Sequence, residues 1–405
     1  MTIANAFWIP ALAMAATTLT ASLEVAPDIP VPAFHLAHPS VLIPAFTHSL
    51  PDTTTSQAAA ANGQPDDSTP EHAGAGDIWQ RLRTGFVFTD QSHNAVRSHL
   101  ETFRKHAWHF RQILQRGEPY LYYVLDRVEA HGLPAELALL PAIESAFDPF
   151  ARSPAGASGI WQFMPETAAE YGLRRDWWFD GRRDIVAATE AALTYLSALH
   201  RRYNGDWLLA LAAYNAGSAR VDRLIRLNRD AGKPTDFWHL PLPAETRNYV
   251  PKLLAVCALI ADPAAHRITL PALADDRFFT VVDTGGPLDL QVAARLSGTT
   301  LEELQRLNPA LTRSVTPPGG AHRLLVPSAS AQRFRERLAQ LPDDQRVQSV
   351  EYRIRPGDTL SAIAVNSQTT VSHLRRLNQL DSTHIVAGRL LMVPVTVAGG
   401  DVSDV

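Results

Sequence analysis

The chain has 405 residues, which is long for one domain and predicts two or more folded units. Hydrophobic residues make up 46% and charged residues 19%, a balance that excludes a fibrous or wholly disordered protein. The net charge is only -4, and no cluster of Lys and Arg with interleaved aromatic residues is present, so we expect no nucleic-acid partner.

The composition of the first 76 residues predicts a leader without stable structure. The segment FWIPALAMAATTLTA has an apolar centre, and small residues around Ala21 are compatible with a cleavage site, so a weak secretory signal is expected. No Lys or Arg precedes Arg81, and no cysteine is present there to carry a lipid. No stretch has the ~18 to 20 apolar residues of a membrane span, so we expect no transmembrane helix. Residues 22–76 are rich in Pro, Ala, Thr, Ser and Asp without periodicity, which is typical of disorder.

A helical pattern extends over residues 77–270 and predicts an all-α domain. Apolar residues recur at steps of three and four, first at Val96, Leu100, Phe103, Ala107 and Phe110 and then at Leu121, Val124, Leu125 and Val128. The segment ELALLPAIESAF predicts a third helix and ETAAEYG a fourth. A fifth is expected to begin behind Asp184 and to end near Tyr203, and Asp206 is expected to cap a sixth that ends at Gly217.

The C-terminal part contains an internal repeat. Four residues recur seventy positions later: Thr300, Leu304, Leu307 and Asn308 return as Thr370, Leu374, Leu377 and Asn378. Each copy opens with a β-like run, continues with two short helical patterns and closes with an apolar strand that ends in Val-Pro. We expect βααβ modules at 278–327 and 349–396, a helical or loose connector at 328–348, and a frayed tail at 397–405.

The remaining cysteine, histidine and arginine residues indicate structural roles. Cys257 is the only cysteine, which excludes an internal disulfide, and its neighbours LLAVCALIA predict a buried helix. The histidines lack metal-ligand spacing, so we expect neither a metal nor a cofactor. Arg182, Arg183 and Asp184 at a predicted helix start indicate pairing and capping.

Glu144 is the strongest candidate for chemistry. Leu137, Leu140, Glu144 and Phe147 follow a 3, 4, 3 spacing, which places the glutamate on the apolar stripe of the third predicted helix. Burial favours the neutral carboxyl, raises its pKa and keeps a proton available for a general acid near neutral pH. A buried glutamate satisfied by an arginine or a backbone donor is the alternative. The following PFARSPAGASGIWQFMPETAAEYGL contains small residues that permit tight turns and leave room for an extended ligand.

The polar motifs around and after Glu144 resemble those of the lytic transglycosylase family related to goose-type lysozyme. They are Glu144-Ser145, the turn with Ser153, Gly156-Ala157, Gly159-Ile160-Trp161-Gln162, Ala213-Tyr214-Asn215-Ala216-Gly217 and Glu245-Thr246-Arg247-Asn248-Tyr249. GIWQ replaces the family's GLMQ, a departure that resembles the membrane-bound lytic murein transglycosylase D branch. The resemblance extends from about residue 77 to residue 327.

The resemblance implies a lysozyme-like all-α catalytic domain with a cleft and with Glu144 as the single acid and base. The implied reaction cleaves the β-1,4 bond between MurNAc and GlcNAc of peptidoglycan without water and yields 1,6-anhydroMurNAc. Hydrolases of this kind normally use two carboxylates. Asp148 is the nearest second candidate, but it lies just beyond the predicted helix beside Pro149, so we interpret it as a turn residue.

The same resemblance implies substrate-binding roles for five residues, namely Ser153, Gln162, Tyr214, Asn215 and Tyr249. Two structural alternatives stay open: Asn215 caps the end of its helix, and Trp161 belongs to the core. Trp177 and Trp178 either stack on sugar or pack a loop.

Residues 352–394 resemble the lysin motif (LysM), a βααβ module that binds N-acetylated glycans. The implied groove lies between the loop after Asn378 and the turn that contains Gly357, Asp358, Thr359 and Leu360. In the first copy the turn has the sequence Pro287-Leu288-Asp289-Leu290 and lacks Gly-Asp-Thr, so we expect a degenerate LysM-like module that binds little.

The sequence therefore predicts a mainly α protein, with a lysozyme-like all-α catalytic domain followed by small α+β modules. We expect a monomeric lytic transglycosylase of the periplasm or cell envelope that binds peptidoglycan glycan strands. The alternatives are a hydrolytic muramidase of the same fold and a noncatalytic peptidoglycan-binding protein.

Overall fold

The structure, a computed structural model, describes residues 76–88, 92–176, 178–317, 322–347, 350–367, 370–378 and 380–393. All of them belong to one structural unit. The expectations for the leader, for Trp177 and for the tail fall outside these residues. Among the described residues, no helix combines the length and the hydrophobicity that a membrane span requires.

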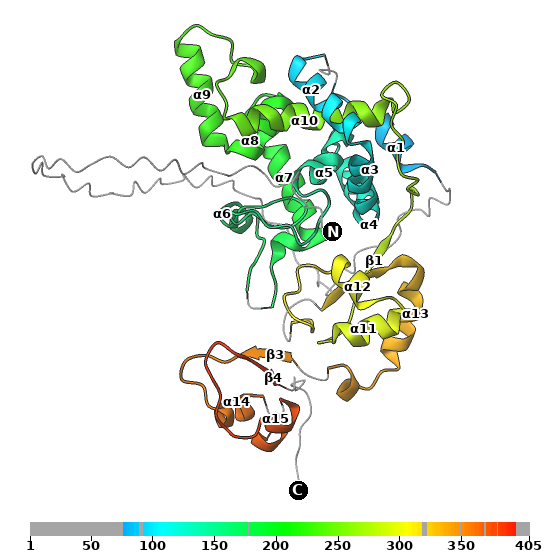
Figure 1. Cartoon of the computed structure of the whole chain (residues 1–405), viewed down its shortest axis with the longest axis vertical. Coiled ribbons are helices and arrows are strands. Elements are labelled where there is room, and N and C mark those ends of the chain that lie inside the picture. Colours follow the sequence, from blue (N-terminus) through cyan, green and yellow to red (C-terminus); the bar gives the residue numbers. More distant parts are fainter. Residues whose placement is uncertain are drawn as a thin grey trace, which may run out of the picture. The chain divides into compact units, whose positions relative to one another are not determined.

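Helices dominate the described residues up to about 261, coloured blue to light green in Figure 1. The α-helices are α1 (Ile78–Thr84), α2 (Asn94–Lys105), α3 (Ala107–Arg116), α4 (Glu118–Ala130), α5 (Leu140–Glu144), α6 (Pro165–Glu170), α7 (Ile185–Arg202), α8 (Trp207–Ala216), α9 (Ser218–Asp230) and α10 (Ala244–Ala261). Three 3-10 helices accompany them: η1 (Ala135–Leu139), η2 (Gly181–Arg183) and η3 (Phe237–His239).

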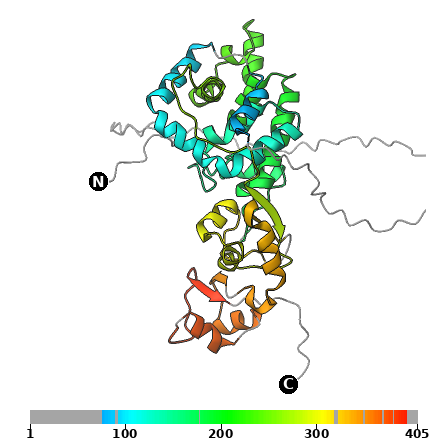
Figure 2. The same cartoon turned by 90° about the vertical axis from the view of Figure 1, so that its right-hand side faces the viewer.

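Helix α10 forms the centre of this domain. Figure 2 views it nearly end-on, with other helices around it, and most of its residues from Tyr249 to Ile260 are buried. Cys257 lies in this buried part, as predicted from its apolar neighbours. The apolar side chains of α10 pack with those of the surrounding helices in one core. Helix α10 is therefore a rigid element, and it holds its residues that face α5 in fixed positions.

Two predicted helix caps are confirmed. Asp184 Oδ1 accepts a hydrogen bond from Ala187 N at 2.8 Å at the start of α7, and Asp206 Oδ1 accepts one from Leu209 N at 2.9 Å at the start of α8. Helix α8 ends at Gly217, whose φ of 84° is accessible to glycine without steric cost.

Two predicted helices are each divided in the structure. The pattern at 96–110 forms α2 and α3, with His106 outside the helical range between them, and the rings of Phe103 and Phe110 pack 5.0 Å apart across the junction. The segment ELALLPAIESAF forms η1 and the short α5, because Pro141 has no N–H to continue the ladder. The α-helical stripe inferred for Glu144 is thus wrong in its geometry.

The C-terminal residues form two modules with the predicted strand, helix, helix, strand order. The first contains β1 (Phe279–Asp283), α11 (Leu290–Ser297), α12 (Leu301–Leu307) and β2 (Arg323–Pro327). The second contains β3 (Val350–Arg353), α14 (Leu360–Asn366), α15 (Val371–Leu377) and β4 (Leu390–Val393). Each pair of strands is antiparallel, with Phe279 opposite Pro327 and Val350 opposite Val393.

A helix follows the first module. It is α13 (Ser328–Ala339), which is succeeded by the 3-10 helix η4 (Asp343–Gln345). Phe334 of α13 is fully buried in the same apolar core as Val282 of β1 and Leu324 of β2. Helix α13 therefore completes the first module.

The asparagine that recurs in both modules has one structural role. Asn308 Nδ2 donates to Leu325 O at 2.8 Å, and Asn308 Oδ1 accepts from Leu325 N at 2.8 Å. Asn378 makes the same pair of bonds with the backbone of Met392. In each module the amide thus joins the end of the second helix to the last strand, which explains why the repeat includes this residue.

Candidate active site

Glu144 is the last residue of α5, directly before a sharp backbone turn. Ser145 ends the helix, and Ala146 and Phe147 follow with φ values of 53° and 56°. Two consecutive non-glycine residues in the left-handed region are costly and persist only where the surroundings enforce them. Phe147 is 1% exposed, and this burial is what holds the turn. Glu144 is thereby presented at the end of a short, fixed element.

Tyr249 is the direct partner of Glu144. Its hydroxyl donates to Glu144 Oε1 at 2.6 Å, a bond that joins α10 to the end of α5. Tyr249 is buried, whereas Glu144 keeps part of its surface exposed. Among the described residues, no other side chain or backbone group bonds to the carboxyl. One carboxyl oxygen is therefore fixed and the other is available to a ligand.

Burial raises the pKa of Glu144 to about 7. The hydrogen bond from Tyr249 and the positive charge of Lys252 act against this rise, and the negative charge of Glu245 adds to it. The residue is open enough to meet a substrate, while the surrounding protein still withdraws water from the carboxyl. A carboxyl with this pKa both holds and releases a proton near neutral pH, as general acid-base catalysis requires.

Lys252 is a charged neighbour that the sequence motifs did not identify. Its ammonium donates to Ile143 O at 3.3 Å, directly before Glu144. Burial lowers the pKa of Lys252 to about 8, and the charge of Glu144 opposes this change. Glu245, Tyr249 and Lys252 recur at four- and three-residue steps of α10, so they share one face of the helix. This spacing is the sequence signal that would have revealed Lys252.

The turn at residues 151–163 lies beside Glu144, because Ser145 Oγ donates to Ile160 O at 3.1 Å. Ser153 Oγ accepts a bond from Ala157 N at 3.0 Å, which leaves the hydroxyl proton for donation to a ligand. Gln162 has a φ of 50°, and its Nε2 donates to Gly159 O at 2.8 Å. Within the described part of the chain, Gln162 Oε1 has no partner and can accept a bond.

A buried ion pair holds this turn in place. The Arg182 guanidinium binds Asp180 at 2.7 Å and donates to Gly156 O at 2.6 Å. Gly159 packs against the same segment: a Cβ on Gly159 would lie 2.1 Å from Arg182 O. The pairing predicted for Arg182 is confirmed, and the structure adds that it shapes the turn.

The other residues of the motifs lie around the two tyrosines. Tyr214 donates to Trp161 O at 3.0 Å, and its pKa is raised by burial and by the charge of Glu144. Asn215 Oδ1 accepts a bond from Thr246 Oγ1 at 2.8 Å, which ties α8 to α10. Trp161 is 0% exposed and donates to Thr189, so of its two alternatives the core position is the correct one.

Asp148 does not form a second catalytic carboxylate with Glu144 in this structure. Its Oδ1 accepts a bond from Phe150 N at 2.9 Å, which is a turn interaction at an exposed position. The described residues hold no group of three or more His, Cys, Asp or Glu side chains arranged for a metal.

In the second module the side chains of the predicted groove stabilise the fold of the module. Asp358 accepts a bond from Tyr352 at 2.7 Å, Thr359 caps α14 and Leu360 is buried. The amide of Asn378 is bound to β4, as described above. A pocket nevertheless lies between residues 353–356 and residues 387–388. Gly357 permits the turn beside this pocket with a φ of 90°.

Three protein families match the chain. The Transglycosylase SLT domain matches residues 127–237, the LysM-like domain of lytic transglycosylase MltD matches 278–343, and the LysM domain matches 352–394. Together with the mainly α fold and the tyrosine-bound glutamate, these matches define a transglycosylase that carries LysM modules.

Two relatives of known name match the chain, and the first of them is a lytic murein transglycosylase. The membrane-bound lytic murein transglycosylase D of Escherichia coli strain K12 is 34% identical over 328 residues, which cover 78% of this chain and 73% of that protein. A putative tributyltin chloride resistance protein of Alteromonas sp. strain M-1 is 45% identical over 122 residues, or 30% of this chain and 59% of that protein. The chain belongs to the lytic murein transglycosylase D family, and it is a lytic transglycosylase.

A solved structure is similar to a segment of this chain. An inactive mutant of the lytic transglycosylase Slt from Pseudomonas aeruginosa is 29% identical, with a TM-score of 0.27, over 36% of this chain and 24% of that chain. The family resemblance and the fold class predicted from the sequence are confirmed by the family matches and by the observed helices and βααβ modules.

Proposed function

We propose that the enzyme cleaves the β-1,4 bond between MurNAc and GlcNAc of peptidoglycan, with Glu144 as its single acid and base. The arrangement of Glu144 carries this proposal: Tyr249 holds one carboxyl oxygen, no described residue bonds to the other, and the pKa of the carboxyl is raised to about 7 by burial. The lytic transglycosylase family to which the chain belongs supports this choice of substrate.

In the first step the protonated Glu144 donates its proton to the glycosidic oxygen. The bond between that oxygen and C1 of MurNAc breaks, and GlcNAc leaves as an alcohol. The N-acetyl group of the substrate itself stabilises the positive charge that develops at C1. The negative charge left on Glu144 is stabilised by the Tyr249 hydroxyl and by the ammonium of Lys252.

In the second step Glu144 recovers its proton from the C6 hydroxyl of the same MurNAc. The C6 oxygen then forms a bond to C1 and closes the 1,6-anhydro ring. Atoms balance without water, and the carboxyl returns to its starting state. One carboxyl with a pKa near 7 is sufficient for both transfers, because it must alternate between acid and base.

The substrate contacts follow from the atoms left available around Glu144. Ser153 has a hydroxyl proton to donate and Gln162 has an amide oxygen to accept, so we assign both to sugar and acetamido groups. Tyr214 and Asn215 are bound to neighbouring elements and shape the site. We place the enzyme in the periplasm or cell envelope, where its substrate lies.

The second module is assigned to glycan binding through the backbone around Gly357, Asp358 and Thr359. Each such contact is weak, and it acts by raising the local concentration of strands near the catalytic domain. The match to the LysM domain at 352–394 supports this role.

The mass of the released muropeptides tests the reaction. Anhydro products are lighter by one water than the products of a hydrolase, so mass spectrometry of digested sacculi separates the two reactions. Products that carry the added water would show a muramidase.

The variant Glu144→Gln tests the catalytic role: we expect turnover to fall by ~10² to 10⁴ while strand binding persists. Unchanged lysis by this variant would indicate a protein that binds peptidoglycan and does not use Glu144 for catalysis.

A further inference from the structure

The two βααβ modules differ at the face where a LysM module binds glycan. In the second module a pocket lies between the turn after β3 and the loop before β4, lined by Arg353, Ile354, Arg355, Pro356, Ala387 and Gly388. In both modules these segments are bonded to each other next to the strands: Thr284 N donates to His322 O at 2.6 Å in the first module, and Ile354 N donates to Arg389 O at 2.9 Å in the second. The first module has two further bonds between the segments: Leu290 N donates to Ser314 O at 2.7 Å, and Thr316 N donates to Leu288 O at 3.0 Å. These two bonds close the segments onto each other in the first module.

The loop before β2 is also longer than its counterpart, and it reaches the catalytic domain. It spans residues 308–322, whereas the loop before β4 spans residues 378–389. Asp180 N donates to Ala310 O at 2.8 Å, Thr312 N donates to Trp178 O at 3.0 Å, and Phe179 and Leu311 form an antiparallel bridge between them. The catalytic domain thus pairs with this loop as a short strand would.

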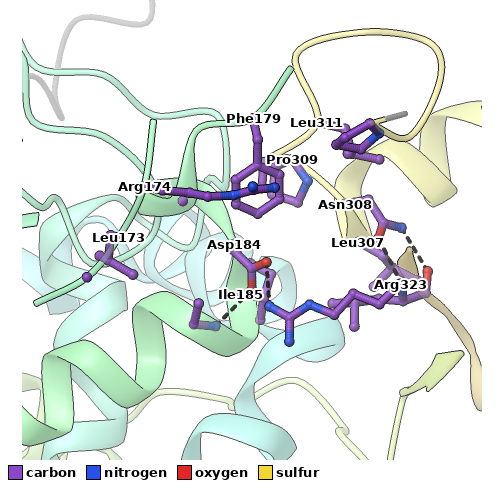
Figure 3. A pocket seen from close by; sticks show the side chains of 16 residues that line it. Leu173, Arg174, Phe179, Asp184, Ile185, Leu307, Asn308, Pro309, Leu311 and Arg323 are labelled. Atoms are coloured by element: carbon purple, nitrogen blue, oxygen red, sulfur yellow. Dashed lines mark hydrogen bonds and ion pairs between the residues drawn. The ribbon is translucent and has the colours of Figure 1, made fainter. Parts of the chain in front are cut away.

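Side chains around the loop extend the contact. Arg323 of β2 forms an ion pair with Asp184 at 2.8 Å, which Figure 3 shows beside Asn308 and Phe179. The Tyr120 hydroxyl of α4 donates to Arg306 O at 2.9 Å. The contact therefore combines backbone pairing, an ion pair and hydrogen bonds from separate elements.

Apolar packing completes the contact. Three apolar residues of the first module belong to the core of the catalytic domain: Phe279, Leu307 and Leu325. The ring of Phe279 lies 5.3 Å from that of Tyr123. A module that shares a dry core with its neighbour does not leave it without exposing that core to water.

We propose that the first module is a docking module for the catalytic domain and has given up glycan binding. The face that in the second module leaves room for a glycan is here closed by two further backbone bonds, and residues 310–312 of the same loop pair with residues 178–180 of the catalytic domain. The second module then binds the glycan, and the first module attaches the C-terminal part of the chain to the catalytic domain.

Docking also reaches the active site through a short chain of contacts. Ala310 O holds the backbone of Asp180, the carboxylate of Asp180 holds Arg182, and Arg182 holds Gly156 O in the turn beside Glu144. The docked loop therefore positions the turn that carries Ser153 and Gln162. We expect disruption of docking to lower turnover even on substrates too short to need a binding module.

A disulfide across the docking contact tests the proposal in the full chain. Residues that form an antiparallel bridge have Cα atoms within disulfide range, so Phe179→Cys together with Leu311→Cys should crosslink on mild oxidation. The native Cys257 is buried and should not interfere. We expect nearly complete crosslinking, with wild-type sacculus binding and muropeptide release. The two single-cysteine variants are the controls.

Two results would overturn the proposal. Little crosslinking would mean that the contact does not form in solution. Crosslinking that lowers sacculus binding, with recovery on reduction, would mean that the module leaves the catalytic domain to bind glycan. Crosslinking is read from the protein itself, so a failure of the proposed reaction would not be confused with a failure of docking.

A charge reversal gives an independent measurement. Arg323→Glu places a carboxylate against Asp184, and we expect slower crosslinking of the cysteine pair and lower kcat on short soluble glycan fragments. Arg335→Glu changes an exposed arginine of α13 and serves as the matched control. Equal kcat for the two variants on short fragments would contradict the link from docking to the active site.

Discussion

The hydroxyl of Tyr249 donates to Glu144 Oε1 across 2.6 Å and so connects the middle of α10 to the last residue of α5. The bond favours the charged carboxylate, whereas burial favours the neutral form, and burial prevails. Burial and the charge of Glu144 raise the pKa of the Tyr249 hydroxyl, so that this hydroxyl remains a donor at neutral pH. Tyr249 is thus suited to steady the carboxylate between the two proton transfers.

Replacing Tyr249 by phenylalanine is expected to lower turnover by about 10- to 100-fold, the effect of losing one hydrogen bond to a charged group. The pKa of Glu144 should rise, because the donor that lowers it is gone. Steady-state kinetics on purified sacculi measure both effects. Tyr195→Phe is the control, since its ring packs 5.4 Å from that of Tyr214 and its hydroxyl makes no bond to Glu144. An equal loss in both variants would show that Tyr249 acts through packing alone.

The pH profile of the wild-type enzyme should report the ionisation of Glu144. The first step needs the protonated carboxyl, whose pKa is raised to about 7, so kcat/KM should fall above about pH 7. Lys252→Met removes a positive charge that lowers this pKa, and the fall should move to higher pH. Lys105→Met, at an exposed end of α2, should leave the profile unchanged. If the pH profile does not move in Lys252→Met, the fall in kcat/KM at high pH is not caused by the ionisation of Glu144.

The stability of the fold should depend on the same carboxyl. The folded protein holds the Glu144 proton more tightly than the unfolded chain, because burial raises the pKa from 4.5 to about 7. The contribution to stability is therefore complete below about pH 4.5 and is lost as the pH rises to 7. At pH 8 the buried charge costs about 1 to 3 kcal/mol. Glu144→Gln should be more stable than the wild type by this amount at pH 8 but not at pH 4.5, as measured by urea unfolding. A difference that is the same at both pH values would contradict a raised pKa.

Much of the fold was predictable because its signals are local. Asp184 and Asp206 cap helices as their positions before apolar segments predict, and the βααβ repeat follows from residues spaced seventy apart. The end of the third predicted helix at Glu144 was not foreseen, since Ala146 and Phe147 adopt left-handed values that neither residue favours. These values are imposed by burial of Phe147, which is a tertiary effect.

The candidate site was only partly predictable for the same reason. Glu144 and Tyr249 were found through motifs, but their contact across 105 residues depends on how α5 meets α10. Lys252 and the anchoring role of Arg182 were missed because each acts on a partner distant in sequence. The prediction for Asn378 identified the residue, but its amide is bound to β4 and supports the module.

Gly159 should tolerate no side chain. It has a φ of 82°, and a Cβ would lie 2.1 Å from Arg182 O. Gly159→Ala is expected to cost about 2 to 4 kcal/mol, from overpacking together with left-handed strain. Gly172 has a φ of 74° with nothing within 4 Å, so Gly172→Ala isolates the strain alone and should cost about 1 kcal/mol. Thermal unfolding of the two variants measures the difference. Equal losses would mean that Arg182 does not confine the turn.

The second module should contribute to attachment and not to bond cleavage. Deletion of residues 349–405 is expected to weaken binding to intact sacculi, where many weak contacts add, and to spare cleavage of short soluble fragments. Because Val347 and Val315 share a core with this module, the deletion exposes apolar surface, and a milder variant is needed beside it. Ala387→Trp fills the pocket between residues 353–356 and 387–388 from an exposed position and should reproduce the loss of binding with the fold intact. Pull-down on sacculi and kinetics on fragments are compared for both variants; an equal loss on the two substrates would argue that residues 349–405 support the catalytic domain and do not bind glycan.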